Sequence, residues 1–462
     1  MVRGGTILAV RQAAGLVVGL GGTIVLTRLL GPTGYGLFAA ALAIQMYLFS
    51  VAQLGIVAWL VRRERTDPSD DLAVNATART LLLGTGLVVV AAGLLVLPLV
   101  VRWIGTDGVR PLAFWLVLSI PVQLLALVPL ATLERQLAYA RIARTELAAQ
   151  VVHYGVSIAL VLAGAGPRGM VAGWWVQQLL LFVVLQALCG SAFRFAFDGA
   201  VARRAVSYGL SYATSIWTWQ LRELVNPLVV GRFVGVEGVA LVALAIRVVD
   251  AASFVKQATW RLALSALARL QQSPERLGAA VREGLRMQML ALAPILLVLA
   301  VAGPRIFPAL FGAGWVGTEM ILPLIAAGTL ANAVTNLHSS ALYVLGRNLQ
   351  VTRFHLAHVA LFAGAAWVLV PLLGLGGYGL AELAALPAYA LVYASFRRTI
   401  PGARQRLELA VGACLVIAVA GCAWSAWWAL VALVPGAFAP VRAATREAAH
   451  SLYAAWTARS TA

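Results

Sequence analysis

The chain has 462 residues, of which 61% are hydrophobic and only 11% are charged, and its mean hydropathy is +0.89. A soluble globular protein carries roughly 45–50% apolar and about 25% charged residues, and no soluble core of this size could bury so much apolar surface. The formal net charge is +18, but the basic residues do not form the basic, aromatic-rich face of a nucleic-acid-binding protein. Composition therefore predicts an integral membrane protein and excludes soluble and nucleic-acid-binding classes.

Continuous apolar runs follow one another along the chain, each about as long as the ~20 residues that a helix needs to cross a bilayer. The runs before residue 200 are 6–30, 35–61, 76–104, 112–133, 145–164 and 169–193. The later runs are 207–231, 237–263, 285–303, 318–345, 353–373 and 377–396. The strands of an outer-membrane barrel alternate with period two, so the runs favour an all-α polytopic protein.

Arginines concentrate in the loops that follow the even-numbered spans, whereas the opposite loops hold few of them. The positive-inside rule then predicts a multi-pass protein of the bacterial inner (plasma) membrane with a cytoplasmic N-terminus. The arginines on the predicted cytoplasmic side of the core are Arg62, Arg63, Arg65, Arg79, Arg135, Arg141, Arg144, Arg194, Arg203, Arg204, Arg269, Arg276, Arg282, Arg286, Arg347, Arg353, Arg397, Arg398, Arg404 and Arg406.

A short internal repeat predicts a two-lobe architecture. Residues 28–41 can be laid on residues 232–245 with an arginine, two glycines, a leucine and two alanines at the same positions. The same hairpin recurs at 372–380 and faintly at 166–169, and each copy predicts a tight turn on the extracytoplasmic side. Glycine-rich turns are common in membrane hairpins, but the matched register favours duplication. The predicted domains are two six-helix lobes, 1–200 and 201–400, followed by an extra hydrophobic segment and an amphipathic tail, 401–462.

The first hairpin, Thr27-Arg28-Leu-Leu-Gly31-Pro-Thr-Gly34-Tyr-Gly, resembles that of the oligosaccharide flippases in the multidrug/oligosaccharidyl-lipid/polysaccharide (MOP) exporter superfamily. Residues 229–247, 304–315 and 376–382 resemble further blocks of that family. The resemblance implies a V-shaped, MATE-like pair of bundles around a cavity that opens alternately to each side. It also implies an undecaprenyl-diphosphate-linked oligosaccharide, moved from the cytoplasmic to the outer leaflet for surface polysaccharide assembly. Members often carry Asp near the position of Asn226, so an ion-coupled role there is in doubt.

Ionisable residues inside the spans are the candidate site, because each costs a few kcal/mol in the bilayer unless it faces protein or water. Arg11, Arg222 and Arg247 are predicted to bind the diphosphate, since guanidinium groups bind phosphate oxygens bidentately and stay charged. Alternatives are a positive-inside anchor for Arg11 and neutralisation of Arg247 by Asp250 at i,i+3. Arg222 could instead pair with neighbours of Glu223 or snorkel along a lobe interface, and Arg28 and Arg232 at the span ends could be membrane-interface anchors. Further candidate substrate-binding residues are Arg28, Gln53, Trp219, Glu223, Asn226, Asp250, Lys256, Asn332 and Asn336. Gln45, Trp217, Gln220 and His338 are further candidate sugar contacts.

No enzyme signature is present: the chain has no phosphate-binding loop, no nucleophile elbow and no zinc motif. No enzymatic activity, cofactor or metal site is therefore predicted, and the three cysteines are expected to be small buried hydrophobic residues. Outward movement of a diphosphate would gain ~2.3 kcal/mol per charge per 100 mV. The expected partners are the lipid-linked oligosaccharide, membrane lipids and a polysaccharide polymerase complex, with a monomer as the functional unit.

Three other functions stay open from the sequence. A drug/cation antiporter of the same superfamily would need intramembrane carboxylates, for which the spans offer only Glu223, Asp250, Glu319 and Glu382. A flippase for the peptidoglycan precursor lipid II would share the cationic cavity. A non-transporting membrane scaffold is the alternative from another class.

The last apolar run, 408–434, is long enough to form a thirteenth span. Arg442, Arg446 and His450 then recur at i,i+4 and suit a helix on the cytoplasmic membrane surface. The two patterns conflict about the side of the C-terminus, and the length of the uncharged run favours thirteen spans. The tail is expected to pack beside the second lobe.

Overall fold

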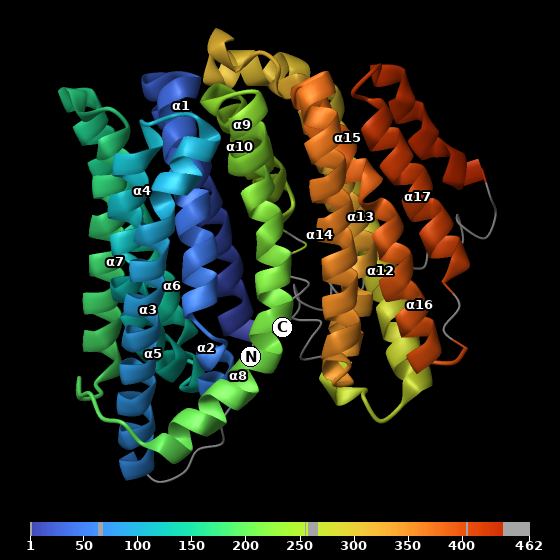
Figure 1. The fold of residues 1–462 in the computed structure, drawn as a ribbon. Helices are drawn as coiled ribbons and strands as arrows, with labels where there is room; N and C mark the ends of the chain where they lie inside the picture. Colours follow the sequence, from blue (N-terminus) through green and yellow to red (C-terminus); the bar gives the residue numbers. More distant parts are fainter. Residues whose placement is uncertain (1, 63–67, 255, 257–266, 403–404, 438–462) are drawn as a thin grey trace. The chain divides into compact units, whose positions relative to one another are not determined.

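The structure, a computed structural model, describes residues 2–62, 68–254, 256, 267–402 and 405–437 (Figure 1). These residues form helices and turns, and no β-strand occurs among them. Nine helices in the described part of the chain are long and apolar enough to cross a membrane. The predicted all-α polytopic class is therefore confirmed. The chain divides into two compact units, Met1–Ala243 (unit 1) and Leu244–Ala462 (unit 2).

Unit 1 is built around α1, which contacts α3, α4, α6, α7 and α8. Its helices are α1 (Val2–Ala52), α2 (Ile56–Arg62), α3 (Pro68–Ile104), α4 (Val109–Leu118), α5 (Ile120–Arg135), α6 (Tyr139–Leu160), η1 (Val161–Ala165), α7 (Pro167–Cys189), α8 (Gly199–Gln220), η2 (Leu221–Leu224), η3 (Asn226–Val230) and α9 (Gly231–Phe233). The next helix, α10 (Val236–Ala252), begins in unit 1 and ends in unit 2.

Glycines at positive φ form the turns that the repeated hairpins predict. Gly31 has a φ of 66° and interrupts α1, so the first two predicted spans are two helices that meet at a kink. The repeat partner Gly235 has a φ of 95°, and the other two hairpins turn at Gly374 (59°) and Gly166 (55°). Glycine adopts these left-handed angles without a Cβ clash, and the predicted turns are confirmed.

Two predicted spans of unit 1 are interrupted within their length. The run 35–61 breaks between α1 and α2, where Leu54 and Gly55 have φ angles of 47° and 67°. The run 207–231 passes from α8 into the 3₁₀ turn η2 and then into the π-helical η3. Pro227 lies at the start of η3 and has no N–H to continue the α-helical ladder, which explains the change of helix type.

A segment without regular secondary structure, 190–198, joins α7 to α8, although the sequence predicted that a span continues to residue 193. Gly190 ends α7 in the left-handed conformation (φ 64°) that favours glycine at a helix C-terminus. Asp198 caps α8, because its Oδ1 accepts hydrogen bonds from the backbone N–H groups of Ala200 (2.8 Å) and Val201 (3.0 Å).

Arg79 corrects one detail of the predicted topology. The sequence placed it among the arginines of a cytoplasmic loop, but α3 begins at Pro68 and includes it. Arg79 is 1% exposed, and its guanidinium donates to the Ala192 carbonyl oxygen (2.9 Å) and to Ser191 Oγ (3.1 Å). Arg79 therefore holds the segment 190–198 onto α3.

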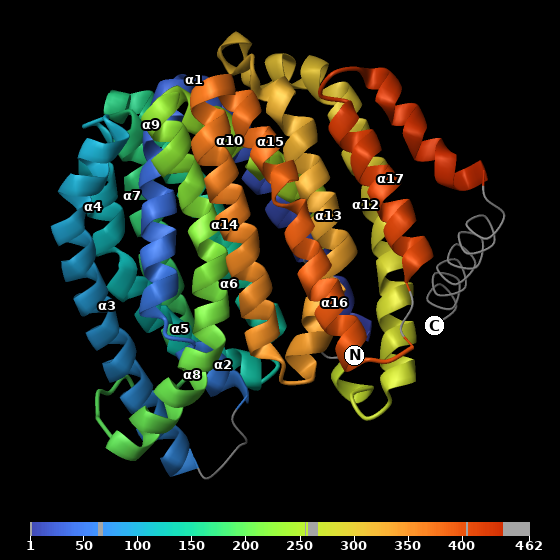
Figure 2. The ribbon, with the colours of Figure 1, turned by 45° about the vertical axis from the view of Figure 1, so that its right-hand side comes forward.

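Unit 2 is organised around α13, whose most apolar window is 78% buried. The helix contacts α12, α15, α16 and α17, and α12, α13, α16 and α17 stand side by side (Figure 2). The helices of unit 2 are α12 (Pro274–Phe311), η4 (Ala313–Trp315), α13 (Thr318–Val344), α14 (Asn348–Leu373), α15 (Leu375–Ala384), η5 (Leu386–Ala388), α16 (Tyr389–Thr399), α17 (Arg406–Gly421) and η6 (Ala426–Ala437).

The predicted thirteenth span is wrong as a single helix over 408–434. α17 has 16 residues, which at 1.5 Å per residue give about 24 Å, less than the ~30 Å hydrocarbon core. The chain then turns, and η6 packs back on α17, where Gly421 lies against the Trp428 ring. Arg442, Arg446 and His450 of the predicted amphipathic tail lie outside the described residues.

Candidate functional site

The break in the seventh predicted span brings three of the predicted site residues together. The Arg222 guanidinium lies 5.5 Å from the centroid of the Trp219 ring and 3.9 Å from Glu223 Oε1. The Arg222 side chain is 21% exposed, so it is shielded on most sides. An arginine over a tryptophan face gains a cation–π attraction, which grows as water is excluded. The 3₁₀ turn η2 thus presents a partly shielded cation within the predicted seventh span, whose described helices are not among the nine that are long and apolar enough to cross a membrane.

Asn226 is buried and connects η3 to α10. Its side chain is 7% exposed, and its Nδ2 donates to the Val239 carbonyl oxygen of α10 at 3.2 Å. Its Oδ1 is buried and has no hydrogen-bond partner among the described residues. The neutral amide therefore fixes η3 against the start of α10.

A pocket of about 410 Å³ opens in unit 1 where α1, α2, α5 and α8 meet. Its polar lining includes Gln53, Glu134 and Trp217. Trp217 Nε1 donates to the Ser50 carbonyl oxygen at 2.8 Å, which fixes the plane of the indole ring. Pockets that bind small molecules have volumes of ~300–1,000 Å³, and this pocket falls within that range.

Backbone contact between two glycines sets one wall of this pocket. Gly55 and Gly209 pack so closely that a Cβ on Gly209 would collide with the Leu54 carbonyl oxygen, and a Cβ on Gly55 with the Gly209 carbonyl oxygen. Only glycine permits this approach at both positions, so the chain brings α8 to the end of α1 without an intervening side chain.

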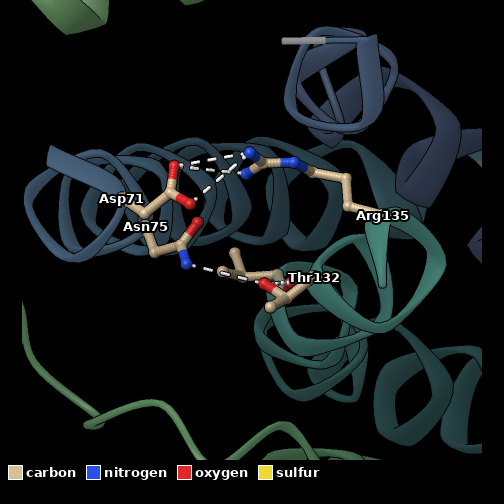
Figure 3. A network of polar contacts seen from close by, with 5 residues as sticks. Asp71, Asn75, Thr132 and Arg135 are labelled. Carbon is tan, nitrogen blue, oxygen red and sulfur yellow. Dashed lines mark hydrogen bonds and ion pairs between the residues drawn. The ribbon is translucent and has the colours of Figure 1, made fainter. Parts of the chain in front are cut away.

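A polar network fixes the end of α5 near Glu134 (Figure 3). Arg135 extends toward Asp71 of α3, with 3.3 Å between Nη1 and Oδ1. One turn further along α3, Asn75 Nδ2 donates to Thr132 Oγ1 at 3.5 Å. These contacts hold α3 and α5 together and so position the neighbouring Glu134 at the pocket.

Gln45 is one candidate sugar contact that the structure places in a helix interior. Its side chain is fully buried and donates from Nε2 to Gln123 Oε1 at 3.3 Å. Gln123 in turn donates to Ser119 Oγ at 2.7 Å. The amide therefore belongs to a packing network between α1 and α5.

In unit 2, polar candidates lie on the central helix α13. Asn332 is half-buried and Asn336 is 8% exposed, with an Oδ1 that lacks a partner in the described part of the chain. His338 is fully buried, with its Nε2 2.6 Å from Gln405 Oε1 and its Nδ1 3.2 Å from the Thr335 carbonyl oxygen. His338 therefore links α13 to the start of α17 as a packing residue.

Sequence reasoning missed Gln288 of α12. It is 1% exposed, and neither atom of its side-chain amide has a partner among the described residues. The only signal in the sequence was one amide within an apolar run.

The three predicted diphosphate ligands do not fall within one described unit. Arg222 lies in unit 1, and Arg247 lies in unit 2 with Asp250 on the exposed face of α10. Arg11 belongs to α1, but its side chain lies outside the described part of the structure. Arg28 is exposed near the Gly31 turn, and Lys256 is half-buried beyond α10. Their joint action on a diphosphate stays a prediction.

Metal ligation has no support in the described residues, where no group of three His, Cys, Asp or Glu side chains could hold an ion.

Comparisons with known proteins agree with this architecture. The profile of the family described as "Polysaccharide biosynthesis protein" matches residues 25–320. The structure is similar to that of the lipid II flippase MurJ in an inward closed conformation, with a TM-score of 0.65, 12% identity, and coverage of 99% of this chain and 100% of that one.

It is also similar to an inward-facing multidrug resistance MATE transporter of the MOP superfamily, with a TM-score of 0.58, 16% identity, and coverage of 87% and 96%. Among curated proteins no match was found. These likenesses confirm the fold that the hairpin motifs predicted. The chain belongs to the family described as polysaccharide biosynthesis protein.

Proposed function

We propose that the protein is a flippase that moves an undecaprenyl-diphosphate-linked oligosaccharide from the cytoplasmic to the outer leaflet of a bacterial inner membrane. The observation that carries the proposal is Arg222, a partly shielded cation at a helix break within the predicted seventh span, which contacts Trp219 and Glu223. Membership of the polysaccharide biosynthesis family supports a glycan-bearing substrate.

The chemistry of a diphosphate suits this position. Insertion of a charged arginine at the centre of a membrane helix costs ~2.5–3.5 kcal/mol. An arginine at such a position therefore points to a functional site. Irregular backbone such as η2 and η3 is tolerated at membrane depth where it is enclosed by protein or lines a water-filled cavity. A guanidinium there can bind two phosphate oxygens at once, and Arg11 and Arg247 would supply further positive charge.

Transport by alternating access needs no nucleotide in this proposal. Two negative charges that move outward gain ~2.3 kcal/mol each per 100 mV when the cell interior is negative. The protein would act as a monomer and deliver its lipid-linked substrate to a polysaccharide polymerase complex.

A drug/cation antiporter is the second candidate, because the fold is shared with MATE transporters. Two of the intramembrane carboxylates are already engaged within the chain. Glu319 Oε2 accepts the backbone N–H of Gly317 at 2.7 Å, and Glu223 lies beside Arg222. The described charges therefore favour an anionic substrate over a cationic one. Lipid II carries the same diphosphate, so only an experiment distinguishes it from a lipid-linked precursor of a surface glycan as the substrate.

Arginine replacement tests the proposal directly. Arg222→Ala should lower surface-glycan export at least tenfold at equal membrane abundance, and Arg222→Lys should restore part of it, because lysine keeps the charge but loses the planar fork. The same pair of changes at Arg11 and Arg247 tests the remaining ligands.

Arg232→Ala is the matched control for these arginine variants. Its guanidinium lies 5.3 Å from the Trp103 ring centroid, so the change also removes a cation–π pair, but at a span end. Export should stay near the wild-type level in this variant. A lipid-linked oligosaccharide should accumulate inside cells in which the gene is deleted. Unchanged surface glycan after deletion, or full export by all three alanine variants, would refute the proposal.

A further inference from the structure

We infer that the pocket between α1, α2, α5 and α8 is a sugar-recognition subsite, which binds the glycan of the lipid-linked substrate through Gln53, Glu134 and Trp217. The inference rests on the proposed function and assigns its glycan-binding part. It concerns unit 1 alone, since every lining residue lies between Ser50 and Trp217.

The three side chains offer the groups that a sugar ring requires. Trp217 is half-buried and held by its hydrogen bond to the Ser50 carbonyl oxygen, so a flat apolar face of fixed orientation borders the pocket. Such a face packs against the C–H surface of a pyranose ring at little cost in side-chain entropy. The Gln53 side-chain amide is half-buried and has no hydrogen-bond partner among the described residues, so it can donate to and accept from hydroxyl groups.

The charge of the lining residues indicates which part of the substrate the pocket binds, the glycan or the diphosphate. None of the described lining residues is basic, and Glu134 is acidic. A carboxylate can accept hydrogen bonds from sugar hydroxyls or from an ammonium group of an amino sugar, and the described lining offers no cation to a phosphate group. The pocket therefore suits a neutral or amino sugar, and the phosphates belong beside arginine.

The predicted membrane orientation places the pocket where substrate arrives. α2 ends at Arg62, Arg63 follows it in the sequence, and the chain after α5 carries Arg141 and Arg144. The same ends of these helices border the pocket, so the positive-inside rule puts it at the cytoplasmic end of unit 1. Lipid-linked glycans for export are presented from that side in the proposed function.

Close backbone packing makes the pocket a preformed site. The contact between Gly55 and Gly209 fixes α8 against the end of α1, and the Asp71–Arg135 pair fixes α5 against α3 (Figure 3). Polar groups on such a rigid frame discriminate by geometry, because a substrate without a matching hydroxyl leaves a pocket group without a partner.

Binding of two lipids to purified full-length protein in nanodiscs tests the inference. The first probe is the lipid-linked oligosaccharide pool extracted from cells that lack the gene, and the second is undecaprenyl diphosphate without sugar. We expect Gln53→Leu and Glu134→Gln each to raise the Kd for the glycan-bearing pool at least fivefold and to leave the Kd for undecaprenyl diphosphate unchanged. Gln136→Leu is the matched control, since this exposed glutamine follows α5 outside the pocket and should alter neither Kd.

The outcomes separate the pocket from the proposed function. Unchanged Kd values for both lipids in the Gln53 and Glu134 variants, with wild-type thermal stability, would overturn the sugar subsite. An equal rise in the Kd for both lipids would overturn it as well, because the variants would then affect binding of the diphosphate or the fold of the protein. If the wild-type protein bound neither lipid, or if no such pool accumulated, the proposed function itself would fail. Selective loss of the glycan-bearing lipid is the result that supports the inference.

Discussion

The Thr33 hydroxyl donates a 2.6 Å hydrogen bond to Glu237 Oε1, and this bond joins the two hairpins that the sequence repeats. Thr33 lies two residues after Gly31, and Glu237 lies two residues after Gly235, so equivalent positions of the repeat meet. Gly36 packs against the Val236 carbonyl oxygen, where a Cβ would collide. The repeated hairpins are therefore in direct backbone contact.

Cross-linking these hairpins should stop export. Both residues lie in unit 1 (Met1–Ala243), and alternating access that operates at this contact requires the two hairpins to separate once in each cycle. We expect a short bifunctional thiol reagent on the Thr33→Cys, Glu237→Cys double variant to abolish surface-glycan export, and a reductant that cleaves the cross-link to restore it. The Thr33→Cys single variant treated with the same reagent is the control, because one thiol cannot form the cross-link and export should be unaffected. Full export by the cross-linked hairpins would contradict alternating access at this contact.

Replacement of Arg79 should release the segment 190–198. Arg79→Met removes the bonds from a buried guanidinium to Ala192 and Ser191, which should lower the free energy of unfolding by about 1–3 kcal/mol. Thermal denaturation in detergent measures the change as a lower midpoint. Arg204→Met is the control, since Arg204 is exposed and its Nε donates to the Ala200 carbonyl oxygen in its own helix. Equal midpoints for the two variants would show that Arg79 does not anchor the segment.

The contact between Gly55 and Gly209 gives a steric prediction. Gly209→Ala places a methyl group on the Leu54 carbonyl oxygen, and the required backbone shift should cost about 1–3 kcal/mol of stability. Gly84→Ala is the control, because a Cβ there meets no atom within 4 Å and alanine favours a helix. We expect its thermal midpoint to be equal to or above that of the wild type. A Gly209→Ala protein as stable as Gly84→Ala would contradict the close packing.

An ion pair attaches the C-terminal helix α17 to α12. Arg286 Nη2 lies 2.8 Å from Glu408 Oε1, and the Glu408 side chain is 5% exposed. Arg286→Met should cost about 3 kcal/mol of stability, because it leaves a buried carboxylate without its partner. Glu408→Gln should cost less, since Arg286 retains Glu283 at 3.8 Å. The double variant should be more stable than the sum of the two changes predicts, and additive losses in thermal midpoint would count against the pair.

Membrane orientation can be checked by labelling with a reagent that cannot cross the membrane. In a background without native cysteines, Asp107→Cys between α3 and α4 should react in intact cells. Gln136→Cys between α5 and α6 should react only after permeabilisation. Both positions are exposed, so access depends on the side of the membrane. Labelling of both from outside would overturn the predicted topology.

The sequence by itself determined the class of the protein and its turns. Membrane helices could be predicted without coordinates, because the length of an apolar run is a local property of the sequence. The turns at Gly31, Gly166, Gly235 and Gly374 could be predicted as well, because a left-handed turn favours glycine. The family resemblance could be predicted for the same reason, since its motifs are these hairpins.

The sequence also placed Trp219, Arg222 and Glu223 in one span, and the structure shows them in contact. Their proximity follows from adjacency in the chain. The π-helix that follows them could not be predicted from hydropathy, because the hydropathy of an apolar run does not depend on whether its backbone is α-, 3₁₀- or π-helical.

Only the tertiary structure decided which polar residues serve packing and which border a cavity. Arg79 looked like a loop arginine, yet it binds a segment more than a hundred residues away, and Gln45 looked like a sugar contact but pairs with Gln123. Glu134 gave no signal, since its place beside Trp217 depends on the approach of α5 and α8. Such long-range contacts arise from the packing of whole helices, and no local pattern of residues encodes them.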